Sequence, residues 1–224
     1  MSAKINILSF TVAVIVAFGA ACATAATTGD SDTTGLIMTD FSNVLSVDQF
    51  DPALGTLNQV TLTVTGRLYG GGKFENFNSS PVDDSMRYIL DQSLDITQGL
   101  TALLGMDKTT DTTLTVNVPA YDGTFDYGGT SGDTETPFDV TDDDVFTYTL
   151  TVDLAPFIGT GTVNFDAVAD ATATIYGANG VVCGTYSYAQ ATVEVVYDYT
   201  PIPEPATITL LGLGALALLW RKRR

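Results

Sequence analysis

The sequence predicts an all-β fold, an antiparallel β-sandwich over residues 27–200, flanked by an N-terminal signal peptide and a C-terminal transmembrane helix. Apolar and polar residues alternate in several runs between these ends, as Phe146, Tyr148 and Leu150 do with the intervening threonines. A period of two is typical of a half-buried strand. Turn-forming residues separate the runs and no long helical pattern interrupts them, so we expect about eight to eleven strands in one domain of roughly 175 residues.

The expected elements follow in order along this domain. Residues 27–32 are predicted to be a flexible polar leader, although Asp30-Ser31-Asp32 begins like a calcium-binding loop. Residues 69–73, with three consecutive glycines, are predicted to be a turn, and residues 86–97 fit a strand pair or a short helix equally well. Residues 119–144 are expected to be surface loop with one hairpin around residues 125–127. Strands are expected within residues 36–50, 60–68, 112–118, 145–154, 163–169, 175–176 and 184–199.

The N-terminal residues 1–26 have the pattern of a secretory signal peptide. Lys4 supplies the positive start, residues 5–18 the apolar segment, and residues 21–25 two small-residue cleavage sites. Cleavage after Ala25 or Ala26 removes Cys22, so the mature chain keeps only Cys183 and forms no internal disulfide. The alternative is a lipoprotein that begins at Cys22, but Gly19 stands where a leucine-like residue is expected.

The C-terminal residues 201–224 combine three features in a fixed order. The triplet Pro203-Glu204-Pro205 is followed by fifteen uncharged residues, 206–220, and then by the basic residues Arg221, Lys222, Arg223 and Arg224. A helix over residues 206–220 is about 22 Å long, shorter than the roughly 30 Å hydrocarbon core of a bilayer. The basic cluster stays on the cytoplasmic side, so everything before the triplet faces outward.

These three features resemble the PEP-CTERM sorting signal of Gram-negative bacteria. In that family the signal is recognised by exosortase, an inner-membrane enzyme similar to cysteine transpeptidases. The resemblance implies that the tail is removed near Pro203 to Pro205 and that the protein moves from an inner-membrane intermediate to the cell surface or extracellular matrix. It also implies an exosortase-like partner and a host that makes exopolysaccharide. The alternative is an ordinary tail anchor that is never cleaved.

A second resemblance lies in the body of the chain. Residues 50–66, FDPALGTLNQVTLTVTG, are similar to the start of the choice-of-anchor E domain, a bacterial surface domain found with several different C-terminal anchors. The match extends loosely to the closing strand before Thr200. The resemblance implies a surface module and supplies no catalytic residues.

The charge of the chain narrows the classes of partner. There are 26 acidic residues against nine basic ones, no histidine, and no lysine or arginine between residues 109 and 206. Such a field repels nucleic acid and anionic lipid, so we expect no nucleic-acid partner and membrane contact only through the C-terminal helix before processing. The absence of histidine excludes Ser-His-Asp hydrolysis and histidine-ligated metal sites.

Two candidate binding sites remain. Asp139, Asp142 and Asp144 are candidate calcium ligands, since hard cations prefer carboxylate and carbonyl oxygens; the alternative is a solvated acidic loop. The second candidate is a sugar-binding platform, because the faces of aromatic rings suit sugar rings. It comprises Tyr121, Tyr127, Tyr186, Tyr188, Tyr197 and Tyr199. The alternative is that these tyrosines pack within strands in the ordinary way.

The expected function follows from these patterns. A glycosidase needs a carboxyl pair at a set separation, and the sequence identifies no such pair. We therefore expect a protein that is not an enzyme, that has no cofactor apart from the candidate calcium ion, and that associates with exopolysaccharide outside the cell. The rival hypothesis is a carbohydrate-binding adhesin, with or without the assistance of calcium.

Overall fold

The computed structural model describes residues 25–134 and 140–202, and the side chains of residues 116 and 140–142 are not described. Residues 25–202 form one compact unit. The predicted signal peptide and C-terminal helix lie outside the described residues. Within the described part of the chain, no helix has the length and apolar character needed to cross a membrane.

The described residues form ten strands and one short 3₁₀ helix, as an all-β prediction requires. The elements are β1 (Ala26–Thr33), β2 (Ile37–Met38), β3 (Phe41–Asp48), β4 (Gly55–Asn76), β5 (Val82–Gln98), β6 (Thr101–Val118), β7 (Gly132–Thr134), β8 (Val140–Leu150), η1 (Ala155–Phe157), β9 (Thr162–Tyr176) and β10 (Val181–Pro201).

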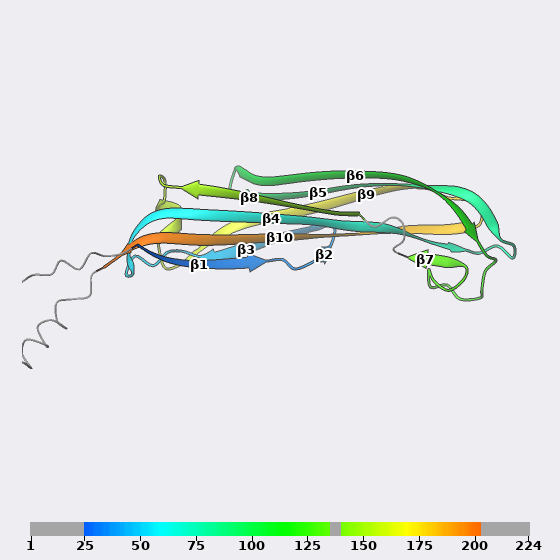
Figure 1. Cartoon of the computed structure of the whole chain (residues 1–224), viewed down its shortest axis with the longest axis horizontal. Coiled ribbons are helices and arrows are strands. Elements are labelled where there is room, and N and C mark those ends of the chain that lie inside the picture. Colours follow the sequence, from blue (N-terminus) through cyan, green and yellow to red (C-terminus); the bar gives the residue numbers. More distant parts are fainter. Residues whose placement is uncertain (1–24, 135–139, 203–224) are drawn as a thin grey trace, which may run out of the picture. The chain divides into compact units, whose positions relative to one another are not determined.

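These strands make two antiparallel sheets, which confirms the predicted sandwich. Sheet A has the order β1-β10-β4-β7, with β2 also paired to β10 and β8 also paired to β4. Sheet B has the order β3-β9-β5-β6. The long strands lie lengthwise, with β4 and β10 side by side (Figure 1).

The pairing of β10 defines two ends of this unit. At the proximal end Tyr199 pairs with Ala26 and Pro201 pairs with Gly55. At the distal end Val181 pairs with Asn76. The 21 residues of β10 separate these ends, which at about 3.3 Å per residue is roughly 70 Å.

The core lies between the sheets and is divided along the strands. The larger cluster is fully buried around residues such as Leu62, Phe165 and Val195, and a smaller distal cluster consists of Phe74, Met86, Tyr88 and Val118. Alternate residues of β3, β4, β5, β6, β9 and β10 supply most of these side chains, as a period of two requires. The burial of apolar area between the sheets is what stabilises the fold, since the described chain contains only the free Cys183 and no disulfide.

The glycine-rich stretch that we predicted to be a turn is part of β4. A Cβ at Gly66 would lie 2.5 Å from Leu104 Cδ2 and from Met106 Sδ, and one at Gly70 would lie 2.7 Å from Leu90 Cδ2. Glycine is needed here because side chains of sheet B approach the backbone of sheet A closely. The turn prediction for residues 69–73 is therefore wrong.

The leader prediction for residues 27–32 is also wrong, because these residues belong to β1. Eight residues of β1 pair in register with β10. The carboxylates of Asp30 and Asp32 accept the backbone N–H groups of Asp48 and Ser46 in β3, each at 2.8 Å. Their spacing of two places both side chains on one face of the strand, where they join the edges of the two sheets.

Two other stretches are also settled by the structure. Residues 86–97 lie in the single strand β5, so both predicted alternatives, the strand pair and the short helix, are wrong. Residues 119–131 are loop, as predicted, but the expected hairpin around residues 125–127 is absent from this described loop. The following segment contains β7 and the start of β8 instead, because both pair with the long strand β4.

Candidate functional site

The predicted calcium ligands are described only in part. Asp139 lies outside the described residues, and only the backbone of Asp142 is described, paired with β4. Asp144 lies opposite Gly66, and its carboxylate accepts the N–H of Val145 at 2.9 Å. Among the described side chains, no group of three or more aspartates, glutamates, cysteines or histidines is suited to hold a metal ion. The calcium site stays a prediction.

Two of the six candidate platform tyrosines belong to the core instead. Tyr197 is 2% exposed, and its hydroxyl donates to the carbonyl of Asp48 at 2.7 Å. Burial raises the pKa of Tyr197 to about 12, with the carboxylates of Asp30 and Asp48 adding to the effect. Tyr199 packs against Phe50, with ring centroids 5.1 Å apart. The platform prediction is wrong for these two residues.

Tyr186 and Tyr188 lie on the outer face of sheet A, where they meet a third tyrosine, Tyr69. Tyr188 is the register partner of Tyr69, and Tyr186 faces Gly71. The ring centroid of Tyr69 is 5.9 Å from that of Tyr186 and 6.2 Å from that of Tyr188. All three side chains are half-buried.

Two grooves lie beside this tyrosine group. One, of about 420 Å³, is bounded by the three rings together with Leu36, Lys73 and Thr134. Another, of about 300 Å³, shares Tyr186, Tyr188 and Lys73 with it. Both grooves are open, half-apolar surfaces, which suits an extended ligand better than an enclosed small molecule.

Tyr121 and Tyr127 lie in the distal loop of residues 119–131, where they join two phenylalanines. Phe77 stacks on Tyr121 with centroids 4.8 Å apart and an interplanar angle of 21°. Phe125 lies 5.1 Å from Phe77 and 4.8 Å from Tyr127. Phe77 and Phe125 are 42% and 53% exposed. These rings therefore form a partly exposed aromatic group at the distal end.

Buried polar groups beneath this loop hold it in place. The carboxylate of Glu75, fully buried, accepts the N–H of Tyr127 at 2.8 Å and the hydroxyl of Ser131. Asn76 Nδ2 donates to the carbonyl of Pro119 at 2.7 Å. The aromatic loop is therefore fixed to the end of β4 at several points.

The loop also contains its own hydrogen-bonded turn. The carboxylate of Asp122 accepts the backbone N–H groups of Thr124 and Thr130. These two bonds lower the pKa of Asp122, and Ser131 adds to the effect. A carboxylate that accepts several N–H groups stabilises the loop in its charged form.

Lys73 connects the two aromatic groups. Its side chain helps to line both grooves beside the tyrosines. Its ammonium lies 4.3 Å from the centroid of the Tyr127 ring, which is the geometry of a cation–π contact. The tyrosine group and the distal loop therefore form one continuous surface.

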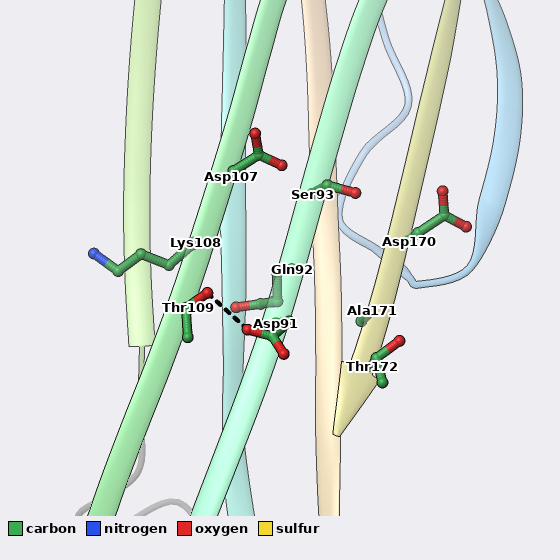
Figure 2. Close-up of a pocket in the computed structure, with 9 residues that line it drawn as sticks. All are labelled: Asp91, Gln92, Ser93, Asp107, Lys108, Thr109, Asp170, Ala171 and Thr172. Atoms are coloured by element: carbon green, nitrogen blue, oxygen red, sulfur yellow. Dashed lines mark hydrogen bonds between the residues drawn. The ribbon is translucent and has the colours of Figure 1, made fainter. Parts of the chain in front are cut away.

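The outer face of sheet B has a different character. Asp107 of β6 and Asp170 of β9 flank Ser93 of β5, and the next row has Asp91 bonded to Thr109 at 2.7 Å (Figure 2). These residues surround an open depression of about 250 Å³. The carboxylates are spread over three strands and do not converge, so this face is a hydrated acidic surface.

Comparison with known proteins identifies one segment. Residues 201–224 match the PEP-CTERM protein-sorting motif. The motif indicates a secreted surface protein that is targeted to exosortase. It includes the predicted sorting residues 203–205 and 221–224, which lie outside the described residues. No curated protein matches the chain.

Two solved structures of infectious bursal disease virus were also found. The structure of the Gt strain aligns with 83% of the chain at 12% identity and a TM-score of 0.14. The VP2 subviral particle aligns with 89% at 12% identity and a TM-score of 0.16. The chain spans 42% and 49% of those proteins. TM-scores this low support no conclusion about fold or function.

Sequence reasoning overlooked Tyr69, Phe77 and Phe125. The strand signal at Tyr69 was hidden by the glycines that follow it, and the two phenylalanines lie outside any periodic run. The sequence did allow the tyrosines of β10 to be divided between the two faces, because Tyr186 and Tyr188 are at even positions and Tyr197 and Tyr199 are at odd positions. A period of two places such pairs on opposite faces.

Proposed function

We propose that the sandwich is a non-enzymatic surface module that associates with exopolysaccharide after export. The observation that supports this most is the joining of two features in one chain. A sorting motif occupies residues 201–224, and clustered aromatic side chains stand on the outer face of sheet A and in the distal loop. Half-buried tyrosine rings beside the grooves and exposed phenylalanine rings in the distal loop suit sugars better than they suit nucleic acid in a chain of this negative charge.

The proposed route to the surface follows the motif. An exosortase-like enzyme removes the tail near Pro203 to Pro205 from an inner-membrane intermediate, and the sandwich passes to the cell surface or matrix. The resemblance of residues 50–66 to the choice-of-anchor E domain supports a surface module of this kind. The absence of histidine excludes catalysis by a Ser-His-Asp triad.

A second candidate is a carbohydrate-binding adhesin that recognises a defined glycan, with calcium at Asp139, Asp142 and Asp144. The aromatic rings favour it as much as they favour the first candidate. The two candidates differ in whether binding is specific and saturable, and in whether calcium is required.

Two measurements separate these candidates. Density-gradient fractionation of the producing culture should place the protein with exopolysaccharide, and enzymatic removal of the polymer should release it. A glycan array with calcium and with chelator should give no saturable binding to a defined glycan if the first candidate is correct. Saturable binding that chelator abolishes would establish the calcium-assisted adhesin. Release of new reducing ends from the polysaccharide during incubation with the protein would contradict a non-enzymatic role.

A further inference from the structure

We propose that the rings of both aromatic groups form a single binding track for a linear, neutral polysaccharide. This inference rests on the proposed association with exopolysaccharide and adds the site and the class of chain. The aromatic track, as defined here, consists of Tyr188, Tyr69, Tyr186, Lys73, Tyr127, Phe125 and Phe77.

The track is continuous from one residue to the next. Tyr69 links Tyr188 and Tyr186 at centroid distances of 6.2 and 5.9 Å. Lys73 shares the groove of these tyrosines and lies 4.3 Å from the Tyr127 ring. Ring contacts of 4.8 and 5.1 Å then lead through Phe125 to Phe77. No break separates the strand surface from the loop.

The track is also long. One end of the track is at Tyr69 in β4, and the other is at Phe77, the residue that directly follows β4. Eight residues of extended chain at about 3.3 Å each cover roughly 26 Å. A single sugar ring would occupy only a small part of this length, so the surface suits a chain of several rings.

The chemistry of the track favours neutral sugars. The faces of aromatic rings are negatively polarised and attract the positively polarised C–H faces of pyranose rings. Lys73 is the one charged residue of the track, and its ammonium is a donor for sugar hydroxyls. The surrounding protein has 26 acidic residues, which repel a uronate or sulfate chain at low ionic strength.

The track is preorganised for binding. Glu75 and Asp122 fix the distal loop through backbone N–H groups, and the tyrosines stand on paired strands. A rigid surface loses little conformational freedom when a ligand binds, so more of the stacking free energy appears as affinity.

Affinity electrophoresis tests this inference. The exported protein, purified from a host with an exosortase system, is run in native gels that contain galactomannan, mixed-linkage β-glucan, alginate or the host's own exopolysaccharide. Neutral polymers should retard the wild-type protein more than alginate does. Tyr188→Ala and Phe125→Ala should each weaken retardation about threefold to tenfold. Tyr176→Ala is the matched control, because Tyr176 is 56% exposed on sheet B and should behave as wild type.

The outcomes distinguish the two proposals. If no polymer retards the wild-type protein, both the track and the proposed function fail. If a polymer retards it but the Tyr188 and Phe125 variants, verified as folded by circular dichroism, are retarded equally, only the track fails. Stronger retardation by alginate would overturn the preference for a neutral chain. A dimer that Phe125→Ala abolishes and galactomannan does not displace would show that a second copy occupies the track instead.

Discussion

At the scale of single residues, the same side chain serves different purposes according to its register. Tyr188 and Tyr197 both belong to β10, nine residues apart. Tyr188 pairs with Tyr69 on the outer face, whereas Tyr197 pairs with Val60 in the core. Both residues are tyrosines, but the odd spacing between their positions places their side chains on opposite faces of the strand, one at the surface and one in the core.

The buried Tyr197 predicts an alkaline limit to stability. Its pKa is raised from 10 to about 12, so the unfolded state loses its proton first as pH rises. The contribution of Tyr197 is fully present below pH 10 and is lost between pH 10 and 12, with a slope of at most about 1.4 kcal/mol per pH unit. Tyr197→Phe should remove this part of the slope and, through the lost hydrogen bond to Asp48, lower stability at pH 7 by about 1 kcal/mol.

Urea denaturation from pH 7 to 12 measures both effects. Burial also raises the pKa of Tyr88, so some alkaline loss should remain in the Tyr197 variant and decrease further when Tyr88→Phe is added. An alkaline slope that is the same in the wild type and the Tyr197 variant would contradict the assignment.

At the scale of elements, the edge of sheet B is protected by side chains of sheet A. Strand β3 is an edge strand, and two of its N–H groups are occupied by the carboxylates of Asp30 and Asp32 in β1. An edge with unpaired N–H groups is a template for pairing with another chain. Strand β1 therefore extends sheet A by pairing with β10, and its two aspartates cover part of the edge of sheet B.

Replacing both aspartates with alanine should expose this edge. We expect the Asp30→Ala/Asp32→Ala variant to lose about 2 kcal/mol of unfolding free energy, about 1 kcal/mol for each hydrogen bond. It should also form soluble oligomers, visible by sedimentation velocity. Asp107→Ala/Asp170→Ala, which removes the same two negative charges from the outer face of sheet B, is the control. Equal stability and a monomer in both variants would refute a protective role for β1.

The elements show what sequence can predict and where it stops. Period-two alternation located residues 60–68 in β4, where one face is buried, and residues 145–150 of the predicted 145–154 in β8, where Tyr148 and Leu150 are half-buried. It failed at residues 69–73, where the interdigitation of the two sheets, invisible in sequence, requires glycine within a strand. It failed at residues 27–32 because an edge strand with polar side chains has no apolar signal. Alternation in the sequence reveals which face of a strand is buried, but contacts between the two sheets can be identified only from the three-dimensional structure.

At the scale of the whole molecule, the residue at which the sorting motif begins and the aromatic track lie toward opposite ends of the described sandwich. The motif begins at Pro201, the residue that pairs with Gly55 at the proximal end. Phe77 follows Asn76, which pairs with Val181 at the distal end. Strands of about 20 residues carry the backbone between them without a break. Processing of the tail and binding at the track therefore involve separate residues and are separable by mutation.

That separation gives the prediction for processing. Replacing Pro203, Glu204 and Pro205 with alanine should leave export and folding intact, because the triplet follows the last strand, while the full-length form accumulates in the inner membrane. Pro201→Ala is the matched control, since it removes a proline outside the triplet. Deleting residues 221–224 should instead disturb topology, because a helix without its basic cluster loses the charge that fixes its cytoplasmic end.

Mass spectrometry of the surface-exposed protein, from a host with the sorting system, decides between processing and a plain anchor. The expected pattern is a processed C-terminus near residues 203–205 in the surface-exposed wild type and Pro201 variant, and an intact C-terminus in the triplet variant recovered from the inner membrane. A wild-type protein that still ends in Arg224 at the cell surface would mean that the tail acts as a permanent membrane anchor.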